Sequence, residues 1–169
     1  WHGFDRIINS ISDFKAKNSN IIINLNIVGD GPDLKRLINL TERLSASDFI
    51  KFHGEKTGKE LEDMYLNSDM AVSSLAGFRK SLFISSEIKS REYCLYGLPF
   101  VLASKDPDFY NCDFVINVEN SDSEIRFEDI LSEYINIRSN GFGKESIHSY
   151  AKEKLTFEAK KKEIISESR

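Results

Sequence analysis

Short β-branched runs alternate with amphipathic helical segments along the whole chain, and this alternation restricts the fold more than any other feature. Residues 21–28 and 100–103 are short, strongly apolar runs, typical of strands buried on both faces of a parallel sheet. Residues 4–14 instead carry a helical apolar stripe, formed by Phe4, Ile7, Ile8, Ile11 and Phe14. Strands that alternate with helices form a parallel sheet with helices on both faces, so the sequence predicts an α/β, Rossmann-like, doubly wound fold.

The same patterns place the remaining elements. Strands are expected at residues 21–28, 49–52, 70–72, 100–103 and 114–116. Helices are expected at residues 4–14, 32–44, 59–66, 86–96, 121–138, 144–152 and 156–166. Ser121 and Glu124 have the spacing of a capping box, which predicts a helix start there. A doubly wound domain normally opens on its central strand. This chain opens on a helix, so we expect a first strand upstream of Trp1 that the chain lacks.

Length and composition exclude several classes of protein. The 169 residues suit one domain, and 23 Lys+Arg against 27 Asp+Glu give a net charge of −4. This mild acidity argues against binding to nucleic acid by charge. The sequence contains neither an apolar run of the roughly 18–20 residues that span a bilayer nor a basic-then-apolar start. Cys94 and Cys112 form no C-x-x-C pair, which favours free thiols and a cytoplasmic location.

Ligands of such sheets bind beyond the carboxyl ends of the strands, beside helix N-termini. Gly29, Gly31 and Pro32 follow the first expected strand. A dinucleotide fingerprint would need glycine at position 34, which is Leu34, so we interpret this segment as a strand-to-helix turn.

The segment before the helix at 86–96 is the stronger candidate site. Ser85 and Ser86 can cap free backbone N–H groups at a helix start, and the same groups can bind a phosphate. The helix dipole is worth only about 0.3–1 kcal/mol, so a diphosphate needs cations as well. The available cations are Lys89, Arg79 and Lys80. The alternative is that Lys89 and Glu92 form a surface ion pair.

Two further features have competing interpretations. His2, followed by Gly3, stands just before a helix and can contact an anion there, although an isolated histidine is more often a surface residue. Asp106 and Asp108 flank Pro107 in an arrangement that imitates a metal-binding D-x-D motif, but a turn is the better interpretation. No metal-ligand spacing links the three histidines, so no metal is expected.

Four segments, in order along the chain, resemble the C-terminal half of glycosyltransferases with the GT-B fold, most closely the large family 4 of retaining enzymes. They are Trp1–Arg6, Leu25–Pro32, Ile50–Gly54 with Leu61–Asp69, and Ile88–Phe100. The first is similar to the family's K-G-x-D-x-x-I helix start and the second to L-x-I-V-G-D-G-P. The last is similar to L-K-x-x-E-Y-x-A-x-G-x-P. A family-like ending is found at residues 150–158.

The resemblance implies that residues 1–169 form the nucleotide-sugar-binding domain of a two-domain enzyme, without its N-terminal acceptor domain. Glu92 matches the second glutamate of an E-x7-E motif, which accepts hydrogen bonds from the donor ribose. The position of the first glutamate is Ile84, and Glu87 is a possible substitute. His2 aligns with a lysine that contacts the diphosphate, so Arg79, Lys80 and Lys89 are expected to supply more of the charge.

The resemblance also implies the chemistry and the surroundings. The nucleotide base is expected near His53, Gly54 and Glu55. The donor is a substrate, and neither a cofactor nor a metal is expected. The intact enzyme would build a surface or capsular polysaccharide, on the cytoplasmic side of a membrane and in peripheral contact with it. The isolated chain is expected to bind a sugar nucleotide weakly and to transfer nothing.

Two other functions stay open at this point. One is a nucleotide-sugar 2-epimerase with the same fold, which needs a complete two-domain cleft. The other is a receiver-like or nucleotide-sensing module, which is not an enzyme. The basic residues 77–80 fit a receiver poorly, because a receiver places acidic residues after its strands.

Overall fold

A computed structural model describes residues 2–161 and has the expected α/β architecture. Its strands are β1 (Leu25–Ile27), β2 (Ile50–Phe52), β3 (Ala71–Val72), β4 (Phe100–Leu102) and β5 (Val115–Asn117). Its helices are α1 (Phe4–Lys17), α2 (Leu34–Arg43), α3 (Gly58–Leu66), α4 (Ile88–Leu95), α5 (Phe127–Ser139) and α6 (Lys144–Lys154). Two 3-10 helices, η1 (Gly77–Lys80) and η2 (Pro107–Phe109), lie in loops after strands.

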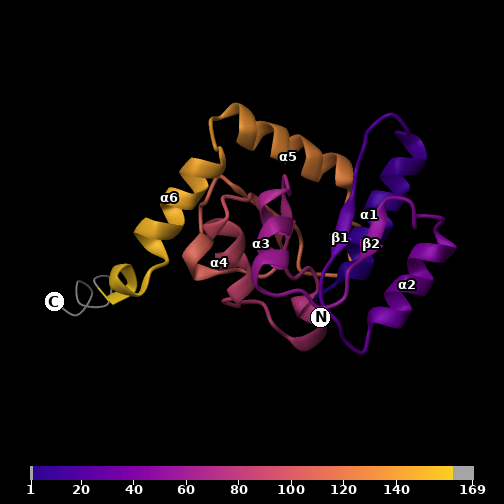
Figure 1. Cartoon of the computed structure of the whole chain (residues 1–169), viewed down its shortest axis with the longest axis horizontal. Helices are drawn as coiled ribbons and strands as arrows, with labels where there is room; N and C mark the ends of the chain where they lie inside the picture. Colours follow the sequence, from indigo (N-terminus) through magenta and orange to yellow (C-terminus); the bar gives the residue numbers. More distant parts are fainter. Residues whose placement is uncertain (1, 162–169) are drawn as a thin grey trace.

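All described strand pairs are parallel, but they fall into two sheets. β1 pairs with β2, with Leu25 opposite Ile50, while β4 lies between β3 and β5. Within residues 2–161 no pairing joins β1 to β3. In Figure 1, β1, β2 and α2 lie on one side of the molecule, and α4 and α6 lie on the other. The backbone N–H of Leu75 donates to the carbonyl of His2 at 2.8 Å, so the start of the chain runs beside the extension of β3.

Helix α1 connects the two sheets through its apolar stripe. Ile7, Ile11 and Phe14 belong to the larger core, which includes β4 and β5. The adjacent Ile8 belongs to a smaller core with Ile27 of β1 and residues of α2 and β2. This split follows from the helical stripe, because a stripe broader than 100° can face two neighbouring sheets at once.

Several expected boundaries are wrong, each for a local reason. The first strand is shorter than residues 21–28, and Ile22 is 87% exposed. Helix α5 begins at Phe127 rather than at Ser121, whose hydroxyl instead accepts from the N–H of Ser123 in a local turn. Helix α4 begins at Ile88, two residues later than expected.

The turn before α2 and the end of the chain differ in part from the expected elements. Pro32 lies in the turn before α2, which begins at Leu34. Of the last expected helix, residues 157–161 are helical, and the rest lies outside the described residues. Over the described residues, none of the helices has the length and apolarity that a membrane crossing requires.

Candidate functional site

The residues after β3 and those at the start of α4 meet beyond the carboxyl end of the sheet. Ser73 and Ser74 follow β3 directly and are fully buried. Glu87 precedes the first residue of α4 in extended conformation and is only 9% exposed. A carboxylate in this position must be paired and hydrogen-bonded to be stable.

Glu87 meets that requirement with serine hydroxyls and a lysine. The hydroxyl of Ser74 donates to Glu87 Oε2 at 2.7 Å and that of Ser73 to the same atom at 3.2 Å. Ser85 donates to Oε1 at 3.4 Å. Lys89 Nζ lies 3.4 Å from Oε2. Both carboxylate oxygens are therefore engaged within the protein, which makes Glu87 a poor substitute for the sugar-binding glutamate missing at position 84.

Lys89 is also held by the start of α1. Its Nζ donates to His2 Nδ1 at 3.0 Å and lies 5.6 Å from the centre of the Phe4 ring. Burial lowers the pKa of Lys89, while the charge of Glu87 opposes that shift. Lys89 lies in the first turn of α4 and contacts His2, just before the start of α1, and the N–H groups at helix starts favour an anion.

His2 does not supply the positive charge that its alignment suggests. Burial, followed by the charge of Lys89, lowers the pKa of His2 to about 4. The imidazole is neutral at pH 7, and its Nδ1 lies 2.9 Å from the hydroxyl of Ser74. Gly3, which follows it, has a φ of +72°, and a Cβ there would lie 2.8 Å from the Cβ of Ala76. The close approach of α1 to the loop after β3 therefore requires glycine.

Glu92 lies one turn further along α4, half-buried at the boundary with α3. Tyr65 of α3 donates its hydroxyl to Glu92 Oε2 at 3.2 Å. The Tyr65 and Tyr96 rings are 4.8 Å apart between centres, so aromatic groups flank the carboxylate. Glu92 and Lys89 share a helix face, but among the described residues Lys89 pairs with Glu87 and no ion pair joins it to Glu92, so the alternative of a surface pair between them is wrong.

Arg79 and Lys80 are not brought to Lys89 by any described contact. Arg79, on η1, is bonded to Asp5 at 2.9 Å and to Asp122 at 3.4 Å. Burial opposes ionisation of Asp5, but the hydrogen bond and the charge of Arg79, together with the charge of Arg36, outweigh it and lower the pKa of that carboxyl. Lys80 is exposed. Of the three cations expected at this site, only Lys89 therefore lies at the start of α4.

Ser85 and Ser86 do not cap α4. Ser85 donates to Glu87, and Ser86 accepts from Arg91 at 3.0 Å. No side-chain hydrogen bond caps α4, so no side chain competes with an anion for the N–H groups of its first turn.

The residues expected near the base lie beside the β1–β2 sheet. His53 Nε2 is 2.7 Å from Asn26 Oδ1, and the carbonyl of Gly54 accepts from Gly29 N–H at 2.7 Å. Glu55 is exposed. The loops after β1 and β2 are thus adjacent. They follow the smaller sheet, whereas Lys89 and Glu92 lie on α4, between β3 and β4 of the other sheet in the chain order.

Arg91 was not identified from the sequence, although its charge and its neighbours make it the main ion-pairing residue of α4. It binds both oxygens of Asp106, at 2.6 and 2.8 Å, and also contacts Asp108. Lys160 contacts the same Asp108. The amide of Asp108 donates to Asp106, which confirms the turn expected for this segment. The sequence signal that indicates this pairing is the presence of two acidic residues in one turn together with a single arginine on α4.

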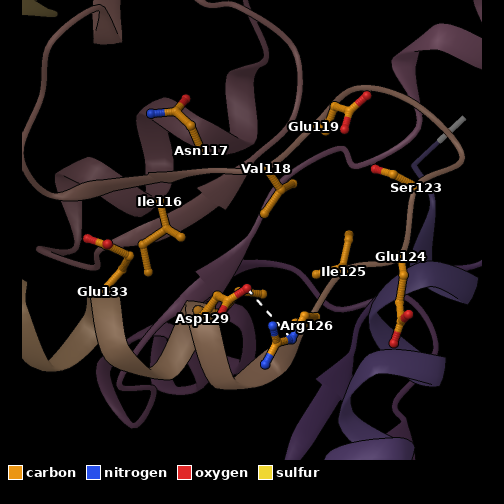
Figure 2. Close-up of a pocket in the computed structure, with 11 residues that line it drawn as sticks. Ile116, Asn117, Val118, Glu119, Ser123, Glu124, Ile125, Arg126, Asp129 and Glu133 are labelled. Atoms are coloured by element: carbon orange, nitrogen blue, oxygen red, sulfur yellow. Dashed lines mark ion pairs between the residues drawn. The ribbon is translucent and has the colours of Figure 1, made fainter.

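Two pockets lie elsewhere on the carboxyl side of the larger sheet. One, between β5 and α5, has a volume of about 270 Å³. Figure 2 shows its lining, which includes Glu119, Glu124 and Glu133. Its cation, Arg126, pairs with Asp129 at 3.9 Å, so the lining does not favour an anion. The other, about 660 Å³, is rimmed by Phe83 and Tyr110.

The comparisons with known proteins agree with this fold. Residues 1–76 match the family model described as glycosyl transferases group 1. Among solved structures, 13 chains match. One of them is the pneumococcal O-GlcNAc transferase GtfA in complex with UDP and GlcNAc, with a TM-score of 0.59 and 16% identity over 98% of this chain. This chain spans 33% of that transferase. The search of curated proteins returned no match.

The fold is thus the Rossmann-like domain of GT-B type that the sequence predicts. The segment of residues 1–76 contains His2, Gly3, β1, β2 and the serines after β3, so the family match covers one side of the site around Lys89.

Proposed function

We propose that this chain is the donor-binding half of a retaining glycosyltransferase, and that the group around Lys89 binds the diphosphate of a sugar nucleotide. The observation that carries the proposal is the position of Lys89, 3.0 Å from His2 and beside the starts of both α1 and α4. A lysine at the N-termini of two helices gives a diphosphate both a full positive charge and backbone donors. The match to group 1 glycosyl transferases supports glycosyl transfer.

Glu92 is assigned to the donor ribose. It lies on the same helix as Lys89, within one turn, and its carboxylate can accept both hydrogen bonds of a vicinal diol. The base would extend toward the loops after β1 and β2, near His53, Gly54 and Glu55.

The intact protein is proposed to contain a preceding strand and an N-terminal acceptor domain. The strand would lie between β1 and β3, because the His2 carbonyl already bonds to Leu75 and the two sheets are unpaired there. The pneumococcal transferase, of which the chain covers 33%, is long enough to contain such a domain. We assign transfer itself to the cleft between the domains.

The proposed product is a surface or capsular polysaccharide, made on a glycan or lipid-linked acceptor at the cytoplasmic face of a membrane. This assignment follows the family resemblance and requires neither a cofactor nor a metal.

Calorimetry with UDP, GDP, ADP and their sugar derivatives tests the proposal. The chain should bind one nucleoside diphosphate, and Lys89→Ala should remove that binding. Lys59→Ala, in an exposed ion pair with Asp63, is the matched control and should bind as the parent does. A parent chain that binds none of the nucleotides, or binding that survives Lys89→Ala, would contradict the proposal.

A further inference from the structure

We propose that Glu87 is a positioning residue for the diphosphate site, whose carboxylate holds the Lys89 ammonium and the serine hydroxyls after β3 in their binding arrangement. This inference rests on the proposed function, and it gives Glu87 a role other than replacing the glutamate missing at position 84. It concerns how Lys89 is held, not which donor is bound.

The contacts of Glu87 connect three parts of the chain. Through Oε2 it accepts from Ser73 and Ser74 after β3 and contacts Lys89 on α4. Ser74 in turn lies 2.9 Å from His2 Nδ1, which accepts from Lys89. Lys89 Nζ therefore lies between a neutral imidazole and a buried carboxylate, in a closed ring of contacts.

The direction of the Glu87 side chain is as important as its charge. A carboxylate at a helix start usually accepts from the first-turn N–H groups, and it would then compete with a phosphate. Glu87 turns instead toward the serines, and no side chain caps α4. The carboxylate thus supports Lys89 without occupying the donors that an anion needs.

The arrangement has a consequence for pH. The groups that face Lys89 are His2 and the Phe4 ring from the start of α1, Glu87 from α4, and the uncharged Ser73 and Ser74 from the loop after β3. Burial lowers the pKa of Lys89, and Glu87 is the negative group that opposes the shift. Without that carboxylate the pKa of Lys89 falls further, so the ammonium is lost at a lower pH.

The experiment compares the pH dependence of anion binding in the parent chain and in Glu87→Gln. The probes are UDP and inorganic pyrophosphate, titrated by calorimetry between pH 6 and pH 9.5. We expect affinities within about threefold of each other at pH 6, and a variant weaker by about 10-fold or more at pH 8.5. Glu145→Gln, an exposed glutamate in the first turn of α6, is the control and should follow the parent at every pH.

A second variant separates positioning from folding. In the double variant E87Q/K89R the guanidinium keeps its charge throughout this range, so binding should lose the pH dependence seen in E87Q alone. If Glu87→Gln does not fold, as judged by its thermal transition, the same comparison is made between the parent and Glu87→Asp. That variant keeps the charge and should keep the parent's pH profile.

The outcomes distinguish the two proposals. Binding by the parent with an identical pH profile in Glu87→Gln overturns the role of Glu87 but leaves the proposed function standing. If Glu87→Gln instead weakens anion binding equally at every pH, and E87Q/K89R does not restore the binding, Glu87 has a purely structural role. That result also overturns its role as a positioning residue. No binding of either probe by the parent overturns both proposals.

Discussion

Tyr65 donates its hydroxyl to Glu92 Oε2 across the boundary between α3 and α4, at 3.2 Å. Burial, reinforced by the negative charge of Glu92, raises the pKa of Tyr65, so the phenol stays a donor across the physiological range. The bond therefore fixes the carboxylate that we assign to the ribose, and it connects the proposed donor site to α3, a helix on which the sequence analysis placed no site residue.

Removal of this hydroxyl should affect nucleotide and pyrophosphate differently. In Tyr65→Phe the ring packing against Tyr96 is kept, but Glu92 loses its orienting donor. We expect about fivefold weaker binding of the nucleoside diphosphate and unchanged binding of pyrophosphate, because one hydrogen bond contributes about 1 kcal/mol. Calorimetry with both probes checks this, with Tyr110→Phe, an exposed tyrosine, as the control. Equal losses for the two probes would place Tyr65 outside the ribose site.

Glu92 itself should contribute more than its donor does. Hydrogen bonds to a charged group are worth about 1.5–3 kcal/mol, so Glu92→Ala should weaken nucleotide binding by about 10- to 150-fold. The measurement is the dissociation constant of the parent's preferred nucleotide. An unchanged constant means that the ribose is bound elsewhere.

The structure separates two cations that the sequence groups together. Lys89→Glu should abolish nucleoside diphosphate binding, since it places a second carboxylate beside Glu87. Arg79→Glu should have an effect of less than about threefold, because Arg79 is committed to Asp5 and Asp122. Titrations of both variants at low and moderate salt test the difference. A large loss of nucleotide affinity in Arg79→Glu at both salt concentrations would show that Arg79 does take part in diphosphate binding.

Arg91 should matter for stability. Its guanidinium pairs with Asp106, whose side chain is 1% exposed. Arg91→Met leaves that buried carboxylate without its cation and should lower the free energy of unfolding by about 3 kcal/mol. Urea denaturation measures the change. Lys59→Met, which breaks only exposed pairs on α3, should leave the free energy of unfolding almost unchanged.

The pair of Asp108 with Lys160 and Arg91 gives stability a dependence on acid. Burial opposes ionisation of Asp108, but the hydrogen bonds from Lys160 and Arg91 lower its pKa below the ordinary value. The stabilisation is therefore fully present above about pH 4, where Asp108 would be ionised even in the unfolded chain, and is lost as pH falls through the lower folded-state value. Denaturation from pH 7 to pH 3 should show a steeper loss in the parent than in Asp108→Asn.

The sequence predicts the parts of this protein that depend on periodicity. The stripe of α1 identifies Ile7, Ile8 and Ile11 as core residues, and the alternation of elements identifies the fold class. The i,i+3 spacing likewise places Lys89 and Glu92 on one face of α4. These relations are local, so the residue pattern contains them.

Other features depend on partners far along the chain. His2 contacts Lys89 across 87 positions, and its neutral state results from burial there. Arg79 has a partner in Asp5, 74 positions away, which nothing near Arg79 reveals. Ser121 also shows that a motif of two residues permits more than one outcome, because its hydroxyl completes a turn instead of a cap.

The position of α1 between two cores has a mechanical consequence. Ile7 and Ile8 are consecutive, yet each is buried in a different core. A rotation of α1 must disturb the packing of both cores at once. Anion binding at the first turn of α1 should therefore change the stability of α2, which packs in the smaller core. Hydrogen exchange of α2 amides, slowed when UDP is bound, would register that transmission.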